Sequence, residues 1–321
     1  MPVLLGGLAI MLAIAGASYQ MVSTRRDAKR FPEPGRRVDI GGYSLKLNCA
    51  GAGSPTVLLE SGFGDVLPEW KSVQERIAKF ARVCSYDRAG YGGSDPGPMP
   101  RASMQIAEEL HLLLHNAGEE PPFILVGHSF GGYNVRVFNG QFPNEVAGMV
   151  LVDSVQEDQY QLLPPDWQRV LADLVKRCRR QARLSFFLVD LGIGRLMLRA
   201  KGQDENSYLI LQSKYLEARA SEAENIHTSA EQARASGTLG DKPLVVLTAG
   251  NEPPPTAGLS QQDLDNYQRI WAGDLQLRLA HLSRRGEQLI VEGSGHDIPA
   301  ERPEAIVSAV REVRAETLVV H

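Results

Sequence analysis

The chain has 321 residues, of which 43% are hydrophobic and 22% are charged. This size and composition fit one large globular domain, or one domain with a sizeable insertion, and they exclude a disordered chain. The net charge of -4, without a stripe of Lys and Arg interleaved with aromatic residues, argues against nucleic-acid binding.

Residues 1–23 contain no charged side chain, and a basic flank follows them. At about 1.5 Å per residue, this segment is long enough to cross the hydrocarbon core of a membrane. We expect an uncleaved membrane anchor, with the basic flank favouring a cytoplasmic position for the domain that follows. The alternatives are a signal peptide cleaved near residues 15–17, which would leave the domain secreted or periplasmic, and a helix buried in the fold. The basic residues of the flank are Arg25, Arg26, Lys29 and Arg30.

Residues 24–36 are rich in proline and glycine toward their end, which predicts a linker, so the first part of the core is expected at residues 37–154. Here short runs of β-branched and apolar residues alternate with helical patterns. Such alternation predicts βαβ units and a mostly parallel sheet with helices on both faces. The expected strands are 43–48, 56–59, 82–86, 123–126 and 148–152, and the expected helices are 70–81, 103–117 and 131–142.

The alternation stops over residues 155–240, where the pattern is helical and predicts a cap inserted into the core. One helix is expected near residues 167–178, with a basic C-terminal end that we interpret as a solvated helix end. The apolar segment 184–198 is expected either to line an acyl pocket or to pack inside the cap. The second part of the core is expected at residues 241–321, with strands 243–248 and 288–291 and a closing helix.

The three cysteines, Cys49, Cys84 and Cys178, are widely spaced and odd in number. No Cys-x-x-Cys pair is present, so the spacing indicates neither a disulfide framework nor a zinc site. We therefore expect the three thiols to behave as small buried hydrophobic groups.

A candidate nucleophile lies in the stretch "FILVGHSFGG", residues 123–132. Gly-x-Ser-x-Gly alone occurs by chance in many chains, but here it joins the end of an expected buried strand to the start of a helix. That junction is where a nucleophile elbow exposes its serine, because glycines on both sides permit the sharp turn. The sequence therefore predicts Ser129 as a nucleophile, and a serine nucleophile needs a base and an orienting acid.

His296 is the best candidate for the base, because it follows the last expected strand on a Gly/Ser-rich loop. The acid has two candidates, each at the end of a core strand, where parallel sheets place functional residues. Asp153 ends the strand that follows the nucleophile, and Glu252 ends the next one. Both preserve the order Ser, Asp or Glu, His, and we favour Asp153 because prolines follow Glu252 directly.

An oxyanion hole is expected from two backbone N–H groups. The strand that ends in "SGFG" presents Phe63, and the residue after the nucleophile is Phe130. The glycine-rich stretch at residues 86–95 lacks the spacing of a phosphate-binding loop.

Together these motifs resemble the α/β-hydrolase fold family over residues 38–313. The matching pieces are "SGFG", "YDRAGYGGSD", "GHSFG", "LVDS" and "GSGH". The resemblance implies an eight-stranded, mostly parallel sheet with helices on both faces, and a helical cap between strands six and seven. It also implies that the reaction uses no cofactor or metal and passes through an acyl-enzyme. Some members place the acid after strand six, which suits Asp153, whereas many place it past strand seven.

A serine nucleophile argues against alkyl-enzyme chemistry, which requires a carboxylate. We therefore expect a membrane-associated carboxylic-ester hydrolase that acts on a small or medium hydrophobic ester. The same three residues would also serve a C–C bond hydrolase, an amidase or a cofactor-free haloperoxidase. A non-catalytic binding protein of the same fold is the alternative from another class.

Overall fold

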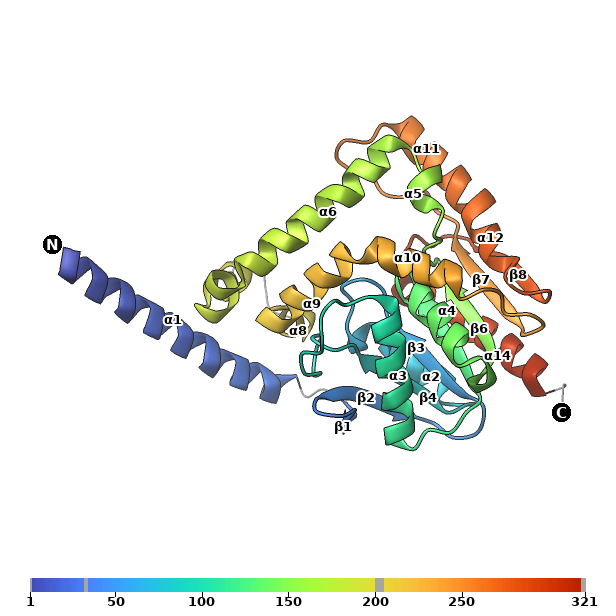
Figure 1. Cartoon of the computed structure of the whole chain (residues 1–321), viewed down its shortest axis with the longest axis horizontal. Coiled ribbons are helices and arrows are strands. Elements are labelled where there is room, and N and C mark those ends of the chain that lie inside the picture. Colours follow the sequence, from blue (N-terminus) through green and yellow to red (C-terminus); the bar gives the residue numbers. More distant parts are fainter. Residues whose placement is uncertain (1, 32–33, 200–204, 319–321) are drawn as a thin grey trace.

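The computed structural model describes residues 2–31, 34–199 and 205–318. Its centre is an eight-stranded sheet in the order β1-β2-β4-β3-β5-β6-β7-β8 (Figure 1). Strand β2 runs antiparallel to both of its neighbours, and every other pair is parallel. The strands are β1 (Arg36–Asp39), β2 (Ser44–Ala50), β3 (Thr56–Glu60), β4 (Val83–Asp87), β5 (Phe123–His128), β6 (Val146–Val152), β7 (Leu244–Ala249) and β8 (Gly286–Val291). The mostly parallel sheet predicted from the alternating pattern is confirmed.

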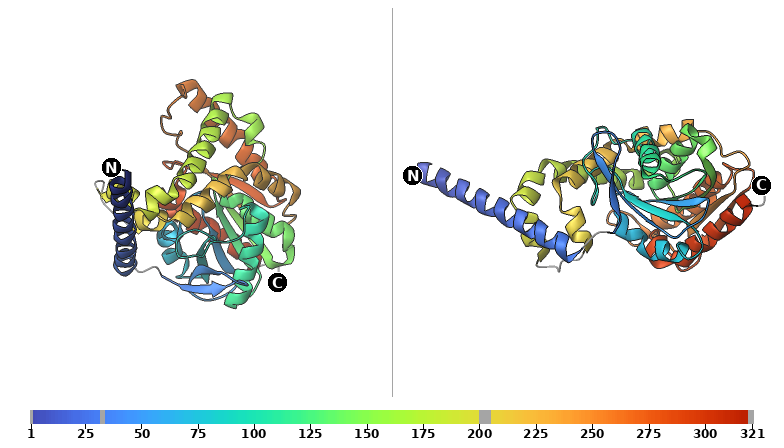
Figure 2. Two further views of the ribbon diagram at one scale, coloured as in Figure 1. Left: turned by 60° about the vertical axis from the view of Figure 1, so that its left-hand side comes forward. Right: turned by 90° about the horizontal axis from the view of Figure 1, so that it is seen from below.

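Helices cover both faces of the sheet (Figure 2). The central strands β3, β4, β5 and β7 are buried along their whole length, as expected for parallel strands packed on both sides. Successive residues point to opposite faces: Leu58 packs with Ile106 of α3 and Val135 of α4, whereas Val57 and Leu59 pack on the other face with α2 and α14. The covering helices are α2 (Lys71–Ile77), α3 (Ser103–Ala117), α4 (Gly131–Gln141), α12 (Gln276–Ala280) and α14 (Pro303–Leu318).

The segment between β6 and β7 is helical, as the sequence predicts, and we call it the cap (Figure 1). Its longest helix, α6, packs along α9. The helices of the cap are α5 (Gln159–Leu162), α6 (Pro165–Arg183), η3 (Phe186–Asp190), α7 (Ile193–Arg199), α8 (Glu205–Ile210), α9 (Ser213–Glu224) and α10 (Ile226–Ala235). The remaining helical elements are η1 (Leu67–Trp70), η2 (Pro143–Glu145), α11 (Gln261–Ile270), η4 (Trp271–Leu275) and α13 (Ile298–Glu301).

Helix α1 (Pro2–Arg30) projects from the body of the protein (Figure 2). Its residues 4–30 are long and apolar enough to cross a membrane, and only 6% of the most apolar window is buried. The alternative of a helix buried in the fold is therefore wrong. The helix also continues to Arg30, through much of the expected linker at 24–36, because most residues of 25–30 are Arg, Lys or Ala, which are good helix formers.

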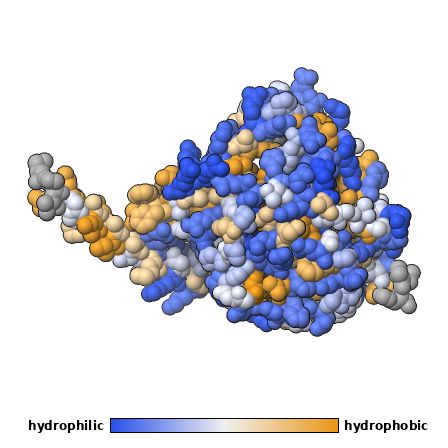
Figure 3. Space-filling view, in the orientation of Figure 1, coloured by the Kyte–Doolittle hydropathy of each residue, from blue (hydrophilic) through white to orange (hydrophobic). Residues whose placement is uncertain are grey.

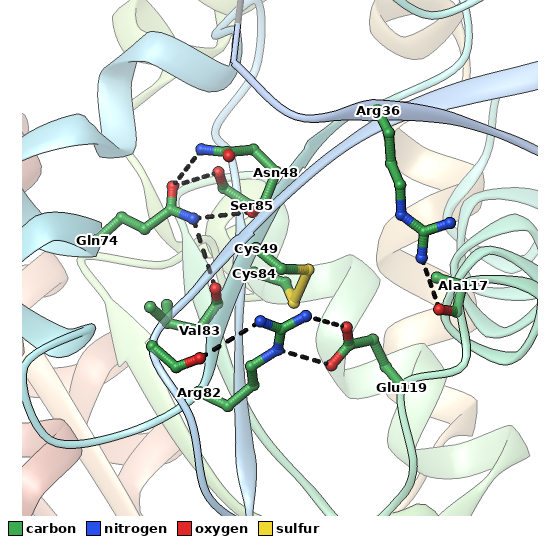
Figure 4. Close-up of a disulfide and its surroundings, with 11 residues drawn as sticks. Arg36, Asn48, Cys49, Gln74, Arg82, Val83, Cys84, Ser85, Ala117 and Glu119 are labelled. Carbon is green, nitrogen blue, oxygen red and sulfur yellow. Dashed lines mark hydrogen bonds and ion pairs between the residues drawn. A yellow bond between two sulfur atoms is a disulfide. The ribbon is translucent and has the colours of Figure 1, made fainter.

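A disulfide joins Cys49 to Cys84, so the expectation of three free thiols is wrong for these two residues. The cysteines are 35 residues apart in sequence, but they are direct cross-strand partners in the antiparallel pair β2 and β4 (Figure 4). Sequence spacing could not reveal this pairing, because it depends on which strands become neighbours. Beside the disulfide, Arg82 at the start of β4 forms two hydrogen bonds with Glu119, of 2.6 and 3.1 Å. Cys178 is free and buried, as expected.

We expect reduction of this disulfide to lower the free energy of unfolding by about 2–4 kcal/mol, because the bond restricts the unfolded chain over a loop of 35 residues. Denaturant unfolding with and without dithiothreitol measures the change. Cys178→Ala is the matched control, and it should keep the full response to dithiothreitol. An unchanged transition midpoint in the reduced wild-type protein would show that the bond contributes nothing to stability.

Candidate active site

Ser129 lies in the turn between β5 and α4, with a backbone φ of 50°. A positive φ is unfavourable for residues with a side chain, and such strain concentrates at functional sites. Among the described residues other than glycine, the one other case is Asp153, with φ 40°, at the end of β6. Both strained residues therefore belong to the candidate site, at the carboxyl edge of neighbouring strands.

The turn that carries Ser129 is packed too closely for side chains at the adjacent glycines. A Cβ atom on Gly131 would lie 2.6 Å from the carbonyl oxygen of Glu60, and one on Gly127 would lie 2.8 Å from the carbonyl oxygen of Gly131. These contacts are with backbone atoms, which cannot move aside. The glycines of the motif thus bring the start of α4 directly against β3 and β5.

The structure brings Ser129, His296 and Asp153 together. Nε2 of His296 lies 2.9 Å from Oγ of Ser129, and Nδ1 of the same ring lies 2.6 Å from Oδ2 of Asp153. His296 comes from the loop between β8 and α13, and about half of its side chain is exposed. Glu252, the other candidate acid, is exposed and accepts a hydrogen bond from Gln261.

The second carboxylate oxygen of Asp153 is held by two N–H donors. The backbone N–H of Ala249 donates over 3.0 Å and the indole Nε1–H of Trp271 donates over 2.8 Å. The carboxylate is buried, and its Oδ2 is thereby fixed toward His296. Sequence reasoning missed Trp271, because no motif surrounds it and it lies 118 positions from Asp153 in the sequence.

Phe63 and Phe130 are neighbours at the site, with ring centroids 6.5 Å apart. Phe130 precedes α4 directly, so its N–H belongs to the positive end of the helix. In the described part of the chain, neither backbone N–H has a hydrogen-bond acceptor. Two free amides beside a serine hydroxyl are the donors that an oxyanion hole needs, and the role of Phe63 and Phe130 in one stays a prediction.

A buried arginine connects the Phe63 loop to the cap. The guanidinium of Arg88, after β4, donates to the backbone carbonyls of Ser61 and Gly62, both over 2.8 Å. It also forms two hydrogen bonds with Glu222 of α9, of 2.9 and 3.0 Å, and one of 3.0 Å with Glu60. Arg88 is 3% exposed, and both carboxylates are fully buried. This arginine fixes the loop that leads to Phe63, and it fixes α9 of the cap to the core.

A cavity of about 540 Å³ opens beside Ser129 and His296. One wall is acidic and carries Asp65, Glu69 and Asp297. Burial, and after it the charge of Glu69, raise the pKa of Asp65 to about 6. The carboxyl of Asp65 therefore becomes protonated as the pH falls through about 6.

His128 lies beneath this wall and is almost fully buried. Its Nε2–H donates to the backbone carbonyl of His296 over 3.0 Å, and its Nδ1 lies 2.9 Å from Oε1 of Glu69. Burial opposes the charge of His128, but the contact with Glu69 outweighs it and raises the pKa of the imidazole to about 9. Asp65, Glu69 and His128 offer three possible metal-ligand atoms within 4.8 Å of one another. Because the contact with Glu69 favours the charged form of His128, we interpret the cluster as an ion pair that supports the His296 loop.

We expect the protein to lose stability at high pH, because the ion pair between His128 and Glu69 is lost there. The folded pKa of His128, about 9, is above the usual ~6.5 of an unfolded chain, so its contribution is complete below pH ~6.5 and disappears as the pH rises through about 9. On the order of 3 kcal/mol of unfolding free energy depends on it. Glu69→Gln should flatten this pH dependence in denaturant titrations, whereas Glu145→Gln, at the more exposed pair with His111, should leave it unchanged. If the free energy of unfolding of Glu69→Gln still depends on pH as in the wild type, the ion pair is not the cause of that dependence.

A second, apolar cavity of about 230 Å³ lies between α6 and α10. Phe63 lines both this cavity and the catalytic one. Its other apolar lining residues include Leu171, Leu174, Val175 and Ile226. The segment 184–198 was expected either to line an acyl pocket or to pack inside the cap. Its described side chains line neither of these two cavities. Val189 is buried, as expected for packing inside the cap, whereas several large side chains, Phe187 among them, are exposed, and the side chain of Leu198 lies outside the described residues.

Comparison with known proteins agrees with this architecture. A curated AB hydrolase superfamily protein of Gibberella zeae is 27% identical over 288 residues, which cover 81% of this chain and 86% of that protein. Among solved structures, an enol-lactonase of Burkholderia xenovorans LB400 has a TM-score of 0.60 at 14% identity, covering 87% of this chain and 100% of that one. A thermophilic esterase of Thermogutta terrifontis has a TM-score of 0.58 at 20% identity, covering 88% and 98%.

Two further curated relatives are matched over only 19% and 49% of their own length, so the chain spans half or less of those proteins. The family model described as "alpha/beta hydrolase fold" matches residues 55–281, which include Ser129 and Asp153. Together with the sheet order and the strained turn at Ser129, this match shows that the chain belongs to the alpha/beta hydrolase fold family.

Proposed function

We propose that the protein is a serine hydrolase that cleaves carboxylic esters through an acyl-enzyme. The observation that carries the proposal is the chain of contacts from Ser129 Oγ through His296 to Asp153, of 2.9 and 2.6 Å. An imidazole between a hydroxyl and a buried carboxylate acts as a general base toward the hydroxyl, because the carboxylate orients the ring and stabilises its charged form.

In the proposed reaction, Ser129 Oγ attacks the ester carbonyl carbon while Nε2 of His296 takes the hydroxyl proton. The carbonyl oxygen becomes an oxyanion that accepts hydrogen bonds from the N–H groups of Phe63 and Phe130. Collapse of this intermediate expels the alcohol, which receives the proton from His296. A water molecule, activated by the same imidazole, then releases the acid and restores Ser129.

We further propose that the apolar cavity beside Phe63 holds the acyl chain of a hydrophobic ester. Its apolar lining favours a hydrocarbon chain, and its volume of about 230 Å³ favours a short or medium one. The esterase and the enol-lactonase of the same fold both bear names of ester-cleaving enzymes, which fits this assignment.

Leu171→Trp should restrict the enzyme to esters with shorter acyl chains, because the indole fills part of the apolar cavity. A methylene that no longer fits costs about 1–3 kcal/mol, so kcat/KM for p-nitrophenyl octanoate should fall by roughly tenfold or more while that for the acetate is kept. Leu277→Trp, at an exposed position on α12, is the control. An equal fall for both esters would place the acyl chain elsewhere.

Labelling by a fluorophosphonate probe tests the proposed function most directly. The expected result is one labelled site, identified by peptide mass spectrometry as Ser129. A folded protein that is not labelled would favour a non-catalytic binding protein. A labelled protein without esterase activity would favour a C–C bond hydrolase, an amidase or a cofactor-free haloperoxidase, which profiling against those substrate classes separates.

We also propose that α1 anchors the protein in a membrane. The basic residues at the C-terminal end of α1 favour a cytoplasmic domain, whereas the disulfide Cys49–Cys84 favours an oxidising compartment, where such bonds form and persist. We give more weight to the disulfide, because orientation by flanking charge is a statistical bias that other signals override. Protease digestion of intact cells or spheroplasts should then degrade the catalytic domain; a fully protected domain would restore the cytoplasmic assignment.

A further inference from the structure

The cap exposes a group of large apolar side chains in one turn. The turn runs from η3 into α7, and the residues are Phe186, Phe187, Ile193, Leu196 and Met197, each 42–65% exposed. We call this set the apolar turn. Large apolar side chains exposed together in one short segment indicate a site that binds another protein or a membrane.

The apolar turn is fixed against helix α1. A Cβ atom on Gly16 of α1 would lie 2.5 Å from the carbonyl oxygen of Leu191, so the two backbones are in direct contact. Arg195, 2% exposed, donates from Nε to Oε1 of Gln20 over 2.9 Å and forms an ion pair with Asp27. The cap therefore contacts α1 from Gly16 to Asp27, and the turn cannot shift along the helix without breaking a buried ion pair.

The length of α1 indicates how deep in a membrane its contact with the apolar turn would lie. A hydrocarbon core of about 30 Å requires ~20 helical residues. The residues from Leu4 to Ala15, about 18 Å of helix, precede the contact of Gly16 with the cap. The candidate membrane span runs from Leu4 to Arg30 and so includes residues beyond Gly16. These are the residues against which the apolar turn is packed.

We propose that the apolar turn inserts into the lipid bilayer beside α1, so that the anchor and the cap form one membrane-docking unit. Figure 3 shows apolar surface along α1 that continues onto the body of the protein where the helix meets it. The exposed charged residues of α1 are all basic, which suits anionic lipid headgroups at the edge of the apolar layer. They are Arg25, Arg26, Lys29 and Arg30.

The docked cap also places the catalytic cavity close to the lipid. Helix α8 contacts α1, and Ile210 at the end of α8 lines the cavity of Ser129. This consequence rests on the proposed function: an ester dissolved in the bilayer reaches the cavity along α8.

Tryptophan quenching by lipids brominated on their acyl chains tests the docking. The full chain carries Ser129→Ala, so that the result does not depend on turnover, and it is reconstituted into vesicles of phosphatidylcholine and phosphatidylglycerol. Phe187→Trp reports on the apolar turn, Leu12→Trp on the exposed part of α1, and Leu277→Trp on the far side of the core. After subtraction of the native tryptophan signal, we expect quenching of the first two reporters and none of the third.

An unquenched Phe187→Trp overturns the proposal, whether or not Leu12→Trp is quenched. A second arm uses the active protein with Phe187→Glu and Leu196→Glu together. Its turnover of an ester dissolved in the vesicles should fall by roughly tenfold or more, because two apolar side chains no longer enter the lipid. Its turnover of a water-soluble p-nitrophenyl ester should be unchanged. Equal loss on both substrates would indicate damage to the fold and would count against docking as the cause.

Discussion

Ser129→Ala is expected to lower kcat for p-nitrophenyl esters by roughly 10⁴–10⁶-fold, because it removes the atom that forms the acyl-enzyme. His296→Ala should cause a loss of similar size, and the double variant should be little worse, since the two residues act as one unit. Ser308→Ala, at an exposed serine on α14, is the matched control and should keep wild-type kinetics. Wild-type turnover in Ser129→Ala would reject the proposed mechanism.

The same assay separates the two candidate acids. Asp153→Asn should lower kcat by about 10⁴-fold, because the amide no longer stabilises the charged imidazole of His296. Glu252→Gln should have no effect, because that carboxylate is exposed and faces Gln261. The reverse pattern would mean that the acid is supplied after β7.

Arg88→Met is expected to produce the largest loss of stability, about 3–5 kcal/mol in the free energy of unfolding. The change leaves Glu60 and Glu222 buried without their cationic partner. Burial already raises the pKa of Glu60, so this carboxyl should become neutral in the variant. Guanidinium unfolding measures the loss, which would be a large fraction of the 5–15 kcal/mol typical of a whole domain.

Two further variants show whether the loss comes from the buried charges. Arg37→Met removes an exposed ion pair with Asp95 and should cost at most about 1 kcal/mol. Arg88→Met combined with Glu222→Met should recover part of the lost stability, because replacing both partners leaves fewer unpaired charges. A single Arg88→Met variant with the wild-type transition midpoint would show that the network contributes nothing.

The sheet and the position of Ser129 were predictable because their signals are local. Alternating strand and helix patterns indicate parallel strands, and the glycines around Ser129 lie within a few residues of it. Asp153 directly follows β6, and His296 lies on the short loop after β8, so the position of each beside a core strand could also be predicted. Their catalytic roles stay predictions.

Features that join distant segments could not be predicted in this way. The Cys49–Cys84 bond depends on the pairing of β2 with β4, and the contact of Trp271 with Asp153 crosses 118 positions. The exposure of the segment around Phe187 depends on where α1 lies, which no local pattern specifies. The continuation of α1 to Arg30 was predictable in principle, since charged helix formers do not end a helix.

The anchoring of α9 by Arg88 limits how substrate can enter. Swinging this helix away from the core would expose or separate a guanidinium and two carboxylates that are now fully buried. The part of the cap formed by α9 is therefore held rigidly against the core. We therefore expect substrate to reach Ser129 without any movement of α9 away from the core.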